Sequence, residues 1–418
     1  MRIAVLGAGV IGITTAYFLA RSGHKVVIID RQSGAAKECS HANAAQLSYC
    51  NAQPWSNRGA LMKGIKWLGK TDAPMRFRMR ADYAMWKWLI QFVANCTEKK
   101  ESENTKHILD FCLYSKSVMQ KHGNDFDFDF NYKRGGKIFV FEEQSAMDSY
   151  QKQCQIQEVM GAPYQVLSFD ELLGYEPNLA HMRNTLVGAI RDPLDDTGDC
   201  YQFCVGLENK LKEMGAEFHY ETTITGFKKN KKHISAVITD KGEIAADTFV
   251  FSLGAYSSQV SKMLGFGLPI HPLKGYSITV DIEDENSAPT TSITYQKERA
   301  VFSKLGNKLR VSGTAEFAGY NHDITPERIE MLKRLTRKVF PNVGNIDAAA
   351  QWACLRPCTP DFRPIIGESK YDNLILNTGH GSLGWTMCFS TAKLITDIVN
   401  GKETEIDIKP FAANRFIL

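Results

Sequence analysis

The chain has 418 residues, of which 44% are hydrophobic and 23% charged, so it can bury more than one core and is no small disulfide-stapled fold. Its 50 basic and 46 acidic residues are too balanced for a protein that neutralises nucleic-acid phosphates, and we expect no nucleic-acid partner. The ten cysteines are irregularly spaced and no His or Cys cluster completes a metal site, which predicts reduced thiols, no bound metal and a cytoplasmic location. No stretch reaches about 18 uncharged apolar residues, so no membrane span is predicted.

The N-terminal segment has the pattern of a dinucleotide-binding domain. An apolar strand is predicted over residues 2–6, followed by the turn from Gly7 to Gly12 (GAGVIG) and a helix over residues 13–22. The first glycine permits the tight turn, the second lets backbone N–H groups approach a pyrophosphate, and the third lets the helix pack closely on the strand. The helix N-terminus then faces the diphosphate, where its partial positive charge is favourable.

A second apolar strand is predicted over residues 25–29, and it ends at Asp30. A carboxylate at this position accepts hydrogen bonds from ribose hydroxyls and repels a 2′-phosphate, which argues against NADP. NAD and FAD both remain possible at this point, because each carries an adenosine diphosphate.

Another glycine-rich turn between a strand and a helix lies near the C-terminal end. A strand is predicted over residues 373–377, the turn from Thr378 to Trp385 (TGHGSLGW) follows it, and a helix is predicted over residues 386–399. An NAD site needs only the first turn, whereas a flavin lies extended and needs a second helix N-terminus near its ring or ribityl chain. The two turns therefore favour FAD.

The remaining segments predict a second domain. Residues 222–244 resemble a meander, and residues 271–338 alternate apolar and polar side chains, which predicts antiparallel strands followed by a helix over residues 326–338. The predicted fold is α/β plus antiparallel β, with a Rossmann-type FAD-binding domain and an inserted mixed, mainly antiparallel substrate domain. The FAD-binding domain is predicted to be discontinuous, at residues 1–50, 151–265 and 345–418. The substrate domain is predicted at residues 51–150 and 266–344, with a basic aromatic helical insertion at about 55–120.

Five segments in order along the chain resemble a known family. They are the turn at residues 7–12, SHANAAQ at 40–46, PLKGYS at 272–277, LRPCTPD at 355–361 and NTGHGSLGWTM at 377–387. Together they resemble the bacterial D-amino acid dehydrogenases, which belong to the FAD-dependent glycine oxidase and D-amino acid oxidase family. The resemblance implies FAD-dependent oxidative deamination of D-amino acids to 2-oxo acids and ammonia, by hydride transfer from the substrate α carbon to the flavin. It also implies that the electrons pass to a quinone or another acceptor that is not oxygen.

The resemblance implies a catalytic role for Arg356 and Tyr276. Arg356 matches the arginine that clamps the substrate carboxylate, and a planar guanidinium is independently suited to bidentate binding of a carboxylate. The alternative for Arg356 is an ion pair with Asp361. Tyr276 is expected to close the pocket and hydrogen-bond the carboxylate, with ordinary strand packing as the alternative. His380 is expected beside the flavin rather than as a base, because the flavin carries the hard step.

The residues expected to bind FAD lie at the two glycine-rich turns, at the ends of the central strands and in the segment after Asp30. They are Gly7, Gly9, Val10, Ile11, Gly12, Asp30, Arg31, Ser40, Asn43, Ala44, Ala45, Gln46, Leu47, Ile224, Gly254, Gly379, His380, Gly381, Leu383, Gly384, Trp385 and Thr386. By the resemblance, the first three glycines hold the diphosphate, Asp30 holds the ribose and Ile224 offers backbone groups to the adenine.

Two other functions remain open. One is a related FAD amine oxidase of the glycine, sarcosine or D-proline type that uses oxygen. The other is a non-catalytic flavin-binding protein, against which Arg356 argues, because a carboxylate clamp has no purpose without a substrate.

Residues 58–100 are locally basic, with ten lysines and arginines against three acidic residues, and they are rich in aromatic side chains. This mixture suits a membrane interface. The alternative is a helical subdomain whose aromatic side chains pack on the core. Because the family implies a quinone acceptor, we expect peripheral contact with the inner face of the cytoplasmic membrane through this segment.

Overall fold

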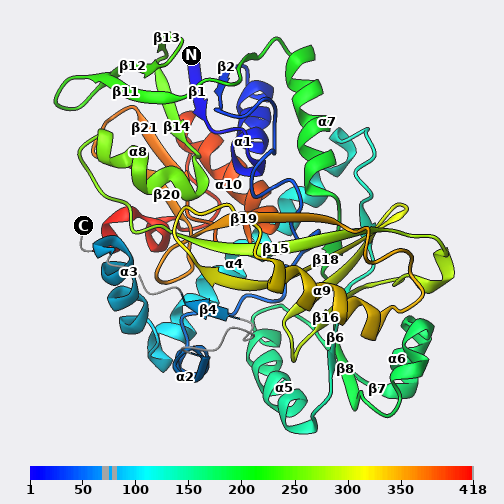
Figure 1. Ribbon diagram of the computed structural model, residues 1–418. Coiled ribbons are helices and arrows are strands. Elements are labelled where there is room, and N and C mark those ends of the chain that lie inside the picture. The colour runs from blue at the N-terminus through cyan, green and yellow to red at the C-terminus, as the bar shows by residue number, and fades with distance from the viewer. Residues whose placement is uncertain (68–74, 78–81, 417–418) are drawn as a thin grey trace.

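Two large β-sheets organise the chain. The computed structural model describes residues 1–67, 75–77 and 82–416. A six-stranded sheet lies in the upper half of Figure 1, and a nine-stranded sheet crosses the middle and extends into the lower half. The predicted combination of a Rossmann-type sheet with a mainly antiparallel sheet is confirmed.

The six-stranded sheet is mainly parallel. In order across the sheet its members are β10 (Glu217–His219), β2 (Lys25–Ile29), β1 (Arg2–Leu6), β14 (Thr248–Phe251), β21 (Leu374–Thr378) and β20 (Ile365–Glu368). Neighbouring strands from β10 to β21 run parallel, and β20 is antiparallel to β21. The four central strands β2, β1, β14 and β21 are mostly apolar and buried, as expected for parallel strands covered on both faces.

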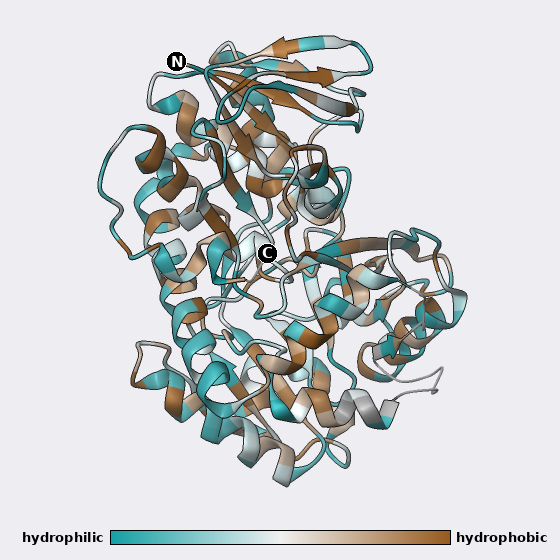
Figure 2. Cartoon of the chain, turned by 90° about the vertical axis from the view of Figure 1, so that its left-hand side faces the viewer, coloured by the Kyte–Doolittle hydropathy of each residue, from teal (hydrophilic) through white to brown (hydrophobic). Residues whose placement is uncertain are grey.

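Helices and a small meander cover the two faces of this sheet. One face packs against α1 (Val10–Arg21), α7 (Cys200–Glu213) and α10 (Gly384–Val399). The other face packs against β11 (Ile224–Lys229), β12 (Ile234–Thr239), β13 (Gly242–Ala245) and α8 (Ser257–Met263). Figure 2 shows the sheet strands mostly in brown, whereas the helices carry both colours.

The nine-stranded sheet carries the rest of the β-structure. In order it contains β19 (Ala350–Cys358), β15 (His271–Asp281), β18 (Lys308–Phe317), β17 (Ala300–Leu305), β16 (Ser292–Tyr295), β6 (Lys137–Phe141), β8 (Gly188–Asp192) and β7 (Gln165–Ser168), with β4 (Met75–Phe77) paired to β18. Its pairs are antiparallel except β16 with β6 and β4 with β18. The predicted helix is α9 (Pro326–Val339), which packs on β15 and β18.

Sheet membership divides the chain differently from the predicted domain segments. β7 and β8 fall in the predicted FAD-binding segment 151–265, and β19 falls in 345–418, but all three strands belong to the nine-stranded sheet. β8 joins this sheet by pairing with β6, in a register that sets Asp192 opposite Lys137. The sequence of a short strand does not indicate which strand it pairs with, so the pairing of β8 with β6 could not be predicted from these segments alone.

Smaller elements fill the space around the sheets. The strands β3 (Gln46–Leu47), β9 (Asp196–Thr197) and β5 (Lys133–Arg134) form a small sheet, and the helices are α2 (Arg58–Trp67), α3 (Tyr83–Ala94), α4 (Glu98–His122), α5 (Gln144–Glu158) and α6 (Phe169–Tyr175). The helices α2, α3 and α4 occupy the segment that was predicted as a helical insertion. Figure 1 places α2 and α3 at the lower left and α6 at the lower right.

A buried ion cluster ties these parts together. Lys137 of β6 is fully buried, and its Nζ lies 2.7 Å from Asp195 Oδ2 and 3.9 Å from Asp192 Oδ2. The same ammonium donates to Ser48 Oγ at 3.0 Å, and Asp195 Oδ1 accepts from the backbone N–H of Cys50 at 2.9 Å. The cluster therefore fixes the segment after β3 against the nine-stranded sheet.

Replacing Lys137 with Met is expected to lower the free energy of unfolding by about 3–5 kcal/mol, because two buried carboxylates lose their cation. Denaturant unfolding followed by circular dichroism measures this change. The exposed Lys152 of α5 provides the control, since the same substitution there should cost less than about 0.5 kcal/mol. A similar small change in both variants would contradict a structural role for the cluster.

Candidate active site

A cavity of about 600 Å³ is lined by residues of both large sheets. Its walls come from the β1–α1 turn, the segment after β2, the ends of β14 and β21, and the strands β15, β18 and β19. This volume is typical of a site for a small molecule or cofactor.

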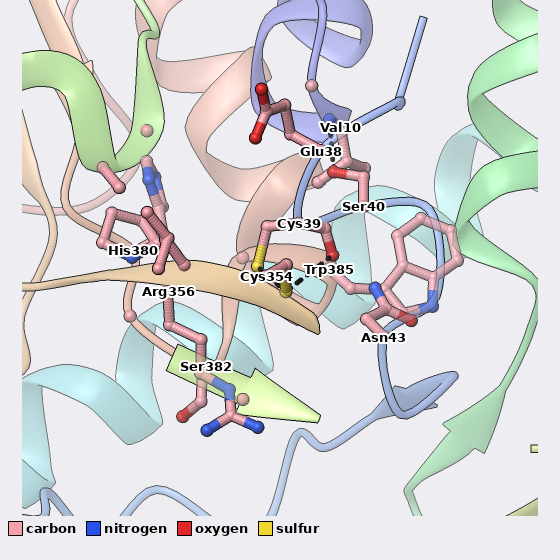
Figure 3. A pocket seen from close by; sticks show the side chains of 18 of the residues that line it. Val10, Glu38, Cys39, Ser40, Asn43, Cys354, Arg356, His380, Ser382 and Trp385 are labelled. Carbon is pink, nitrogen blue, oxygen red and sulfur yellow. Dashed lines mark hydrogen bonds between the residues drawn. The ribbon is translucent and has the colours of Figure 1, made fainter. Parts of the chain in front are cut away.

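Most of the predicted site residues line this cavity, although they come from distant parts of the chain. They are Gly7, Gly9, Val10, Ile11, Asp30, Arg31, Ser40, Asn43, Ala44, Gln46, Ile224, Gly254, Tyr276, Arg356, His380, Gly381, Leu383, Gly384 and Trp385. Figure 3 shows several of them around one space, with Val10 and Ser40 on one side and Arg356 and His380 on the other.

The other predicted residues support the wall and do not face the cavity. They are Gly12, Ala45, Leu47, Gly379 and Thr386. A Cβ at Gly12 would overlap the carbonyl oxygen of Gly7, so this glycine serves the close helix packing predicted for it. Leu47 is fully buried in the core. Because α10 begins two residues before the predicted start, Thr386 lies inside its first turn, where its Oγ1 accepts from the backbone N–H of Ser48 at 2.9 Å.

Hydrogen bonds hold the first glycine-rich turn in place. Asp30, at the end of β2, accepts from the backbone N–H of Ala8 at 2.6 Å and of Gln32 at 2.8 Å. Burial raises the pKa of this carboxyl. Ser40 Oγ accepts from the backbone N–H of Val10 at 3.0 Å. The glycine-rich turn, the end of β2 and the segment after it therefore form one rigid corner of the cavity, called here the nucleotide end.

Acidic lining residues are found at this nucleotide end. Glu38 forms an ion pair with Arg31, whose guanidinium lies 3.7 Å from the centre of the Tyr256 ring. Asp30 and Glu38 are the only acidic residues among the described residues that line the cavity. The charge of Arg31 is thus neutralised locally.

The N-termini of two helices border the same cavity. Gly9 precedes α1 and Leu383 precedes α10, and neither residue caps its helix with a side chain in the described structure. Free N–H groups at a helix N-terminus bind phosphate and other electron-rich groups. Two such ends on one cavity, together with the glycine turn, fit the extended shape of FAD.

Arg356 lies on β19 at the opposite side of the cavity, called here the substrate end. Its Nη1 donates to the carbonyl oxygen of Thr314 at 3.4 Å. The alternative ion pair with Asp361 is not formed, because Asp361 pairs with Arg363 at 3.1 Å and with Arg415 at 2.7 Å. Within the described structure the guanidinium of Arg356 has no carboxylate partner.

The structure argues against the role predicted for the Tyr276 hydroxyl. This hydroxyl donates to Glu316, and it lies 2.9 Å from Thr325 Oγ1 on the side of α9. Glu316 is in turn paired with the buried Lys274, with 3.4 Å between Nζ and Oε2. Tyr276 still lines the cavity, but its hydroxyl is held by groups that lie behind the strand.

His380 lies in the second glycine-rich turn and is buried. Its Nε2 is 3.3 Å from Thr391 Oγ1 of α10. Burial lowers the pKa of the imidazole to about 3, so the side chain is neutral at neutral pH. This environment places an uncharged ring in the cavity wall.

Several polar lining residues were not identified from the sequence. Cys39 and Cys354 both line the cavity, and their sulfur atoms lie 3.1 Å apart (Figure 3). Arg299 comes from the turn between β16 and β17, and Thr314 comes from β18. No motif marks Arg299, Thr314 or Cys354, which the pairing of distant strands brings to the cavity, and Cys39 lies in the segment after β2.

The fold and the family comparison define an FAD-dependent oxidoreductase. The family described as FAD dependent oxidoreductase matches residues 2–398, and the chain belongs to this family. The family resemblance and the FAD cofactor predicted from the sequence are confirmed.

Relatives and solved structures agree with this assignment. The chain is 38% identical over 416 residues to a protein named D-amino acid dehydrogenase from Rhizobium rhizogenes, covering 100% of both chains, and equally similar to one from Agrobacterium fabrum. Its fold is similar to glycine oxidase from Bacillus cereus, with a TM-score of 0.76 and 19% identity over 100% of this chain and 99% of the other. L-proline dehydrogenase from P. horikoshii gives a TM-score of 0.74 and 18% identity over 99% and 97% of the two chains.

A change at Gly275 tests whether the position of Arg356 matters. A Cβ at Gly275 would overlap Nη2 of Arg356, and this flexible side chain must then move. We expect Gly275→Ala to weaken the binding of propionate, a simple carboxylate, by about 10-fold or more while FAD stays bound. Titration followed by the flavin absorbance spectrum measures both properties.

The control for this variant is Gly267→Ala, because nothing lies within 4 Å of a Cβ at that position. Propionate binding should be unchanged in the control. Unchanged binding in Gly275→Ala as well would remove Arg356 from the carboxylate site.

Proposed function

We propose that the protein catalyses the FAD-dependent oxidative deamination of D-amino acids to 2-oxo acids and ammonia. Relatives named D-amino acid dehydrogenase that align over the whole chain support this activity. The observation that carries the proposal is Arg356, a guanidinium without an ion-pair partner in the described structure, in a cavity that also borders both glycine-rich turns.

In the proposed reaction, Arg356 binds the α-carboxylate of the substrate through charge-assisted hydrogen bonds. FAD, when bound, supplies the chemistry by accepting the hydride from the α carbon. The glycine-rich turns and Asp30 hold the cofactor, and Arg356 fixes the α carbon relative to it. The neutral His380 contributes shape without adding a charge beside the reacting centre.

Anaerobic mixing with D-alanine tests the activity. We expect rapid loss of the flavin absorbance with D-alanine and none with L-alanine. In Arg356→Lys the substrate KM should rise about 10- to 100-fold at unchanged FAD content, because the ammonium keeps the charge but loses the bidentate fork. Flavin that D-amino acids do not bleach would identify a non-catalytic flavoprotein instead, and an unchanged KM would remove the clamp role.

The proposal includes a quinone or another non-oxygen electron acceptor, which the dehydrogenase names of the relatives support. The reduced enzyme should reoxidise slowly in air and rapidly with a soluble quinone analogue. Rapid reoxidation in air would favour the amine oxidase alternative.

We also propose that α2 and α3 contact a membrane surface. In the described residues no helix is long and apolar enough to cross a membrane. One face of α3 presents Tyr83, Trp86, Ile90 and Val93 to solvent, with Tyr83 82% and Ile90 69% exposed. This spacing forms a stripe along the helix.

The sequence left two interpretations of the aromatic side chains in this segment, contact with a membrane or packing on the core. Individual side chains of the segment agree with one or the other. Trp88 is buried, and its Nε1 donates to the carbonyl oxygen of Cys358 at 2.9 Å, so it packs on the core. Lys66 of α2 and Lys87 of α3 are exposed. Lys70, Arg78 and Arg80, which belong to the predicted basic surface, lie outside the described residues.

The enzyme is expected to sediment with anionic-lipid vesicles at low salt and to be released at high salt, because surface attraction is screened over about 10 Å at 0.1 M. The double variant Trp86→Ser with Ile90→Ser should reduce sedimentation at low salt. The control replaces Ile156 and Val159, an exposed apolar pair at the end of α5, with Ser. Recovery in the supernatant at every salt concentration would contradict membrane contact.

A further inference from the structure

A second arginine opens into the substrate end of the cavity. Arg299 is the last residue of the turn 296–299 between β16 and β17, and its side chain lines the cavity. Its φ is +52°, in the left-handed region that residues with a side chain rarely adopt. Strained residues of this kind cluster at functional sites, where the surrounding structure holds them in place.

The pairing of β17 with β18 places the turn that carries Arg299 next to the part of β18 that Arg356 contacts. Val301 of β17 pairs with Ser312 of β18, and a Cβ at Gly313 would lie 3.3 Å from the Cβ of Ala300, the residue after Arg299. Thr314 is the residue whose carbonyl oxygen accepts from Arg356 Nη1. Arg299, Thr314 and Arg356 all line the cavity.

This end of the cavity carries two positive charges without a negative one. Neither Arg299 nor Arg356 forms an ion pair with any residue that the structure describes. The acidic lining residues Asp30 and Glu38 belong to the nucleotide end, and the buried Glu316 behind Tyr276 is already paired with a lysine. The Arg299 side chain is exposed, and an arginine stays charged at neutral pH.

Two hydroxyl groups beside these arginines also lack partners. Thr314 Oγ1 and Ser312 Oγ are buried without a hydrogen bond in the described structure, and both residues line the cavity. Buried polar groups are normally hydrogen-bonded, so unpaired hydroxyls in a cavity wall indicate a polar ligand. Both can donate to the oxygen atoms of a carboxylate.

We propose that Arg299 is a specificity-determining residue that binds a second carboxylate, on the side chain of the substrate. The enzyme then prefers acidic D-amino acids, D-aspartate and D-glutamate, to neutral ones. The identity of the substrate rests on the proposed function, in which Arg356 takes the α-carboxylate. A zwitterion such as D-alanine can pair its one carboxylate with one arginine only, whereas the two carboxylates of an acidic D-amino acid can pair with both.

Isosteric substrate pairs test this preference. We expect kcat/KM to favour D-glutamate over D-glutamine, or D-aspartate over D-asparagine, by about 10-fold or more. Arg299→Gln should abolish the preference by lowering kcat/KM for the acidic substrate more than for the amide, and Arg299→Lys should retain part of the preference. The control Lys297→Gln removes one positive charge from the same turn, where Lys297 pairs with Glu142, and should leave the preference unchanged.

Two outcomes of these assays would overturn the proposal. One is an unmodified enzyme that shows no preference for the acidic member of either pair. The other is an equal loss of kcat/KM for both members in Arg299→Gln, which would assign Arg299 to the α-carboxylate together with Arg356.

A binding measurement separates this proposal from the proposed function. Glutarate should bind at least about 10-fold more tightly than butyrate, as followed by the flavin absorbance spectrum, and Arg299→Gln should remove the difference. If this holds while no D-amino acid reduces the flavin, the dicarboxylate site stands and the proposed function fails. If D-amino acids reduce the flavin but glutarate and butyrate bind equally, the proposed function stands and the role of Arg299 fails.

Discussion

The antiparallel pairing of β15 with its neighbours β18 and β19 determines the substrate end of the site. A continuous register from His271 opposite Cys358 to Thr279 opposite Ala350 leaves no freedom in where Arg356 lies along the sheet. Gly275 lies on β15, and because it has no side chain it leaves room for the guanidinium of Arg356 on β19. The close approach of these two strands is thus the constraint from which the carboxylate site follows.

Charge is distributed unevenly over the molecule, and the distribution separates structural from functional groups. The buried cations Lys137 and Lys274 each have a buried carboxylate partner, and Arg415 is paired with Asp361. These pairs hold segments together and leave little free charge for a ligand. The arginines at the substrate end lack such partners in the described structure, and because Arg299 is exposed and Arg356 half-buried, their charges remain available to an anion.

Local motifs allowed much of the fold and nucleotide end to be predicted from the sequence, because strand, glycine turn, helix and Asp30 are close together in the chain. Arg356 was found through its motif. Two features of the site could not be predicted from local patterns. The partners of the Tyr276 hydroxyl come from β18 and the start of α9, and Arg299 reaches the cavity through the pairing of β17 with β18. The start of α10 was placed too late, since Gly384 normally favours a turn rather than a helix.

The strand order of the six-stranded sheet sets when the cofactor site can form during synthesis. β1 and its glycine turn are made first, but β1 pairs with β14, and β14 pairs with β21 near residue 375. Such long-range pairing is slow, and apolar strands stay exposed on the nascent chain until their partners arrive. The flavin pocket is thus completed only when nearly the whole polypeptide has been translated. FAD can therefore bind only near the end of synthesis or after it.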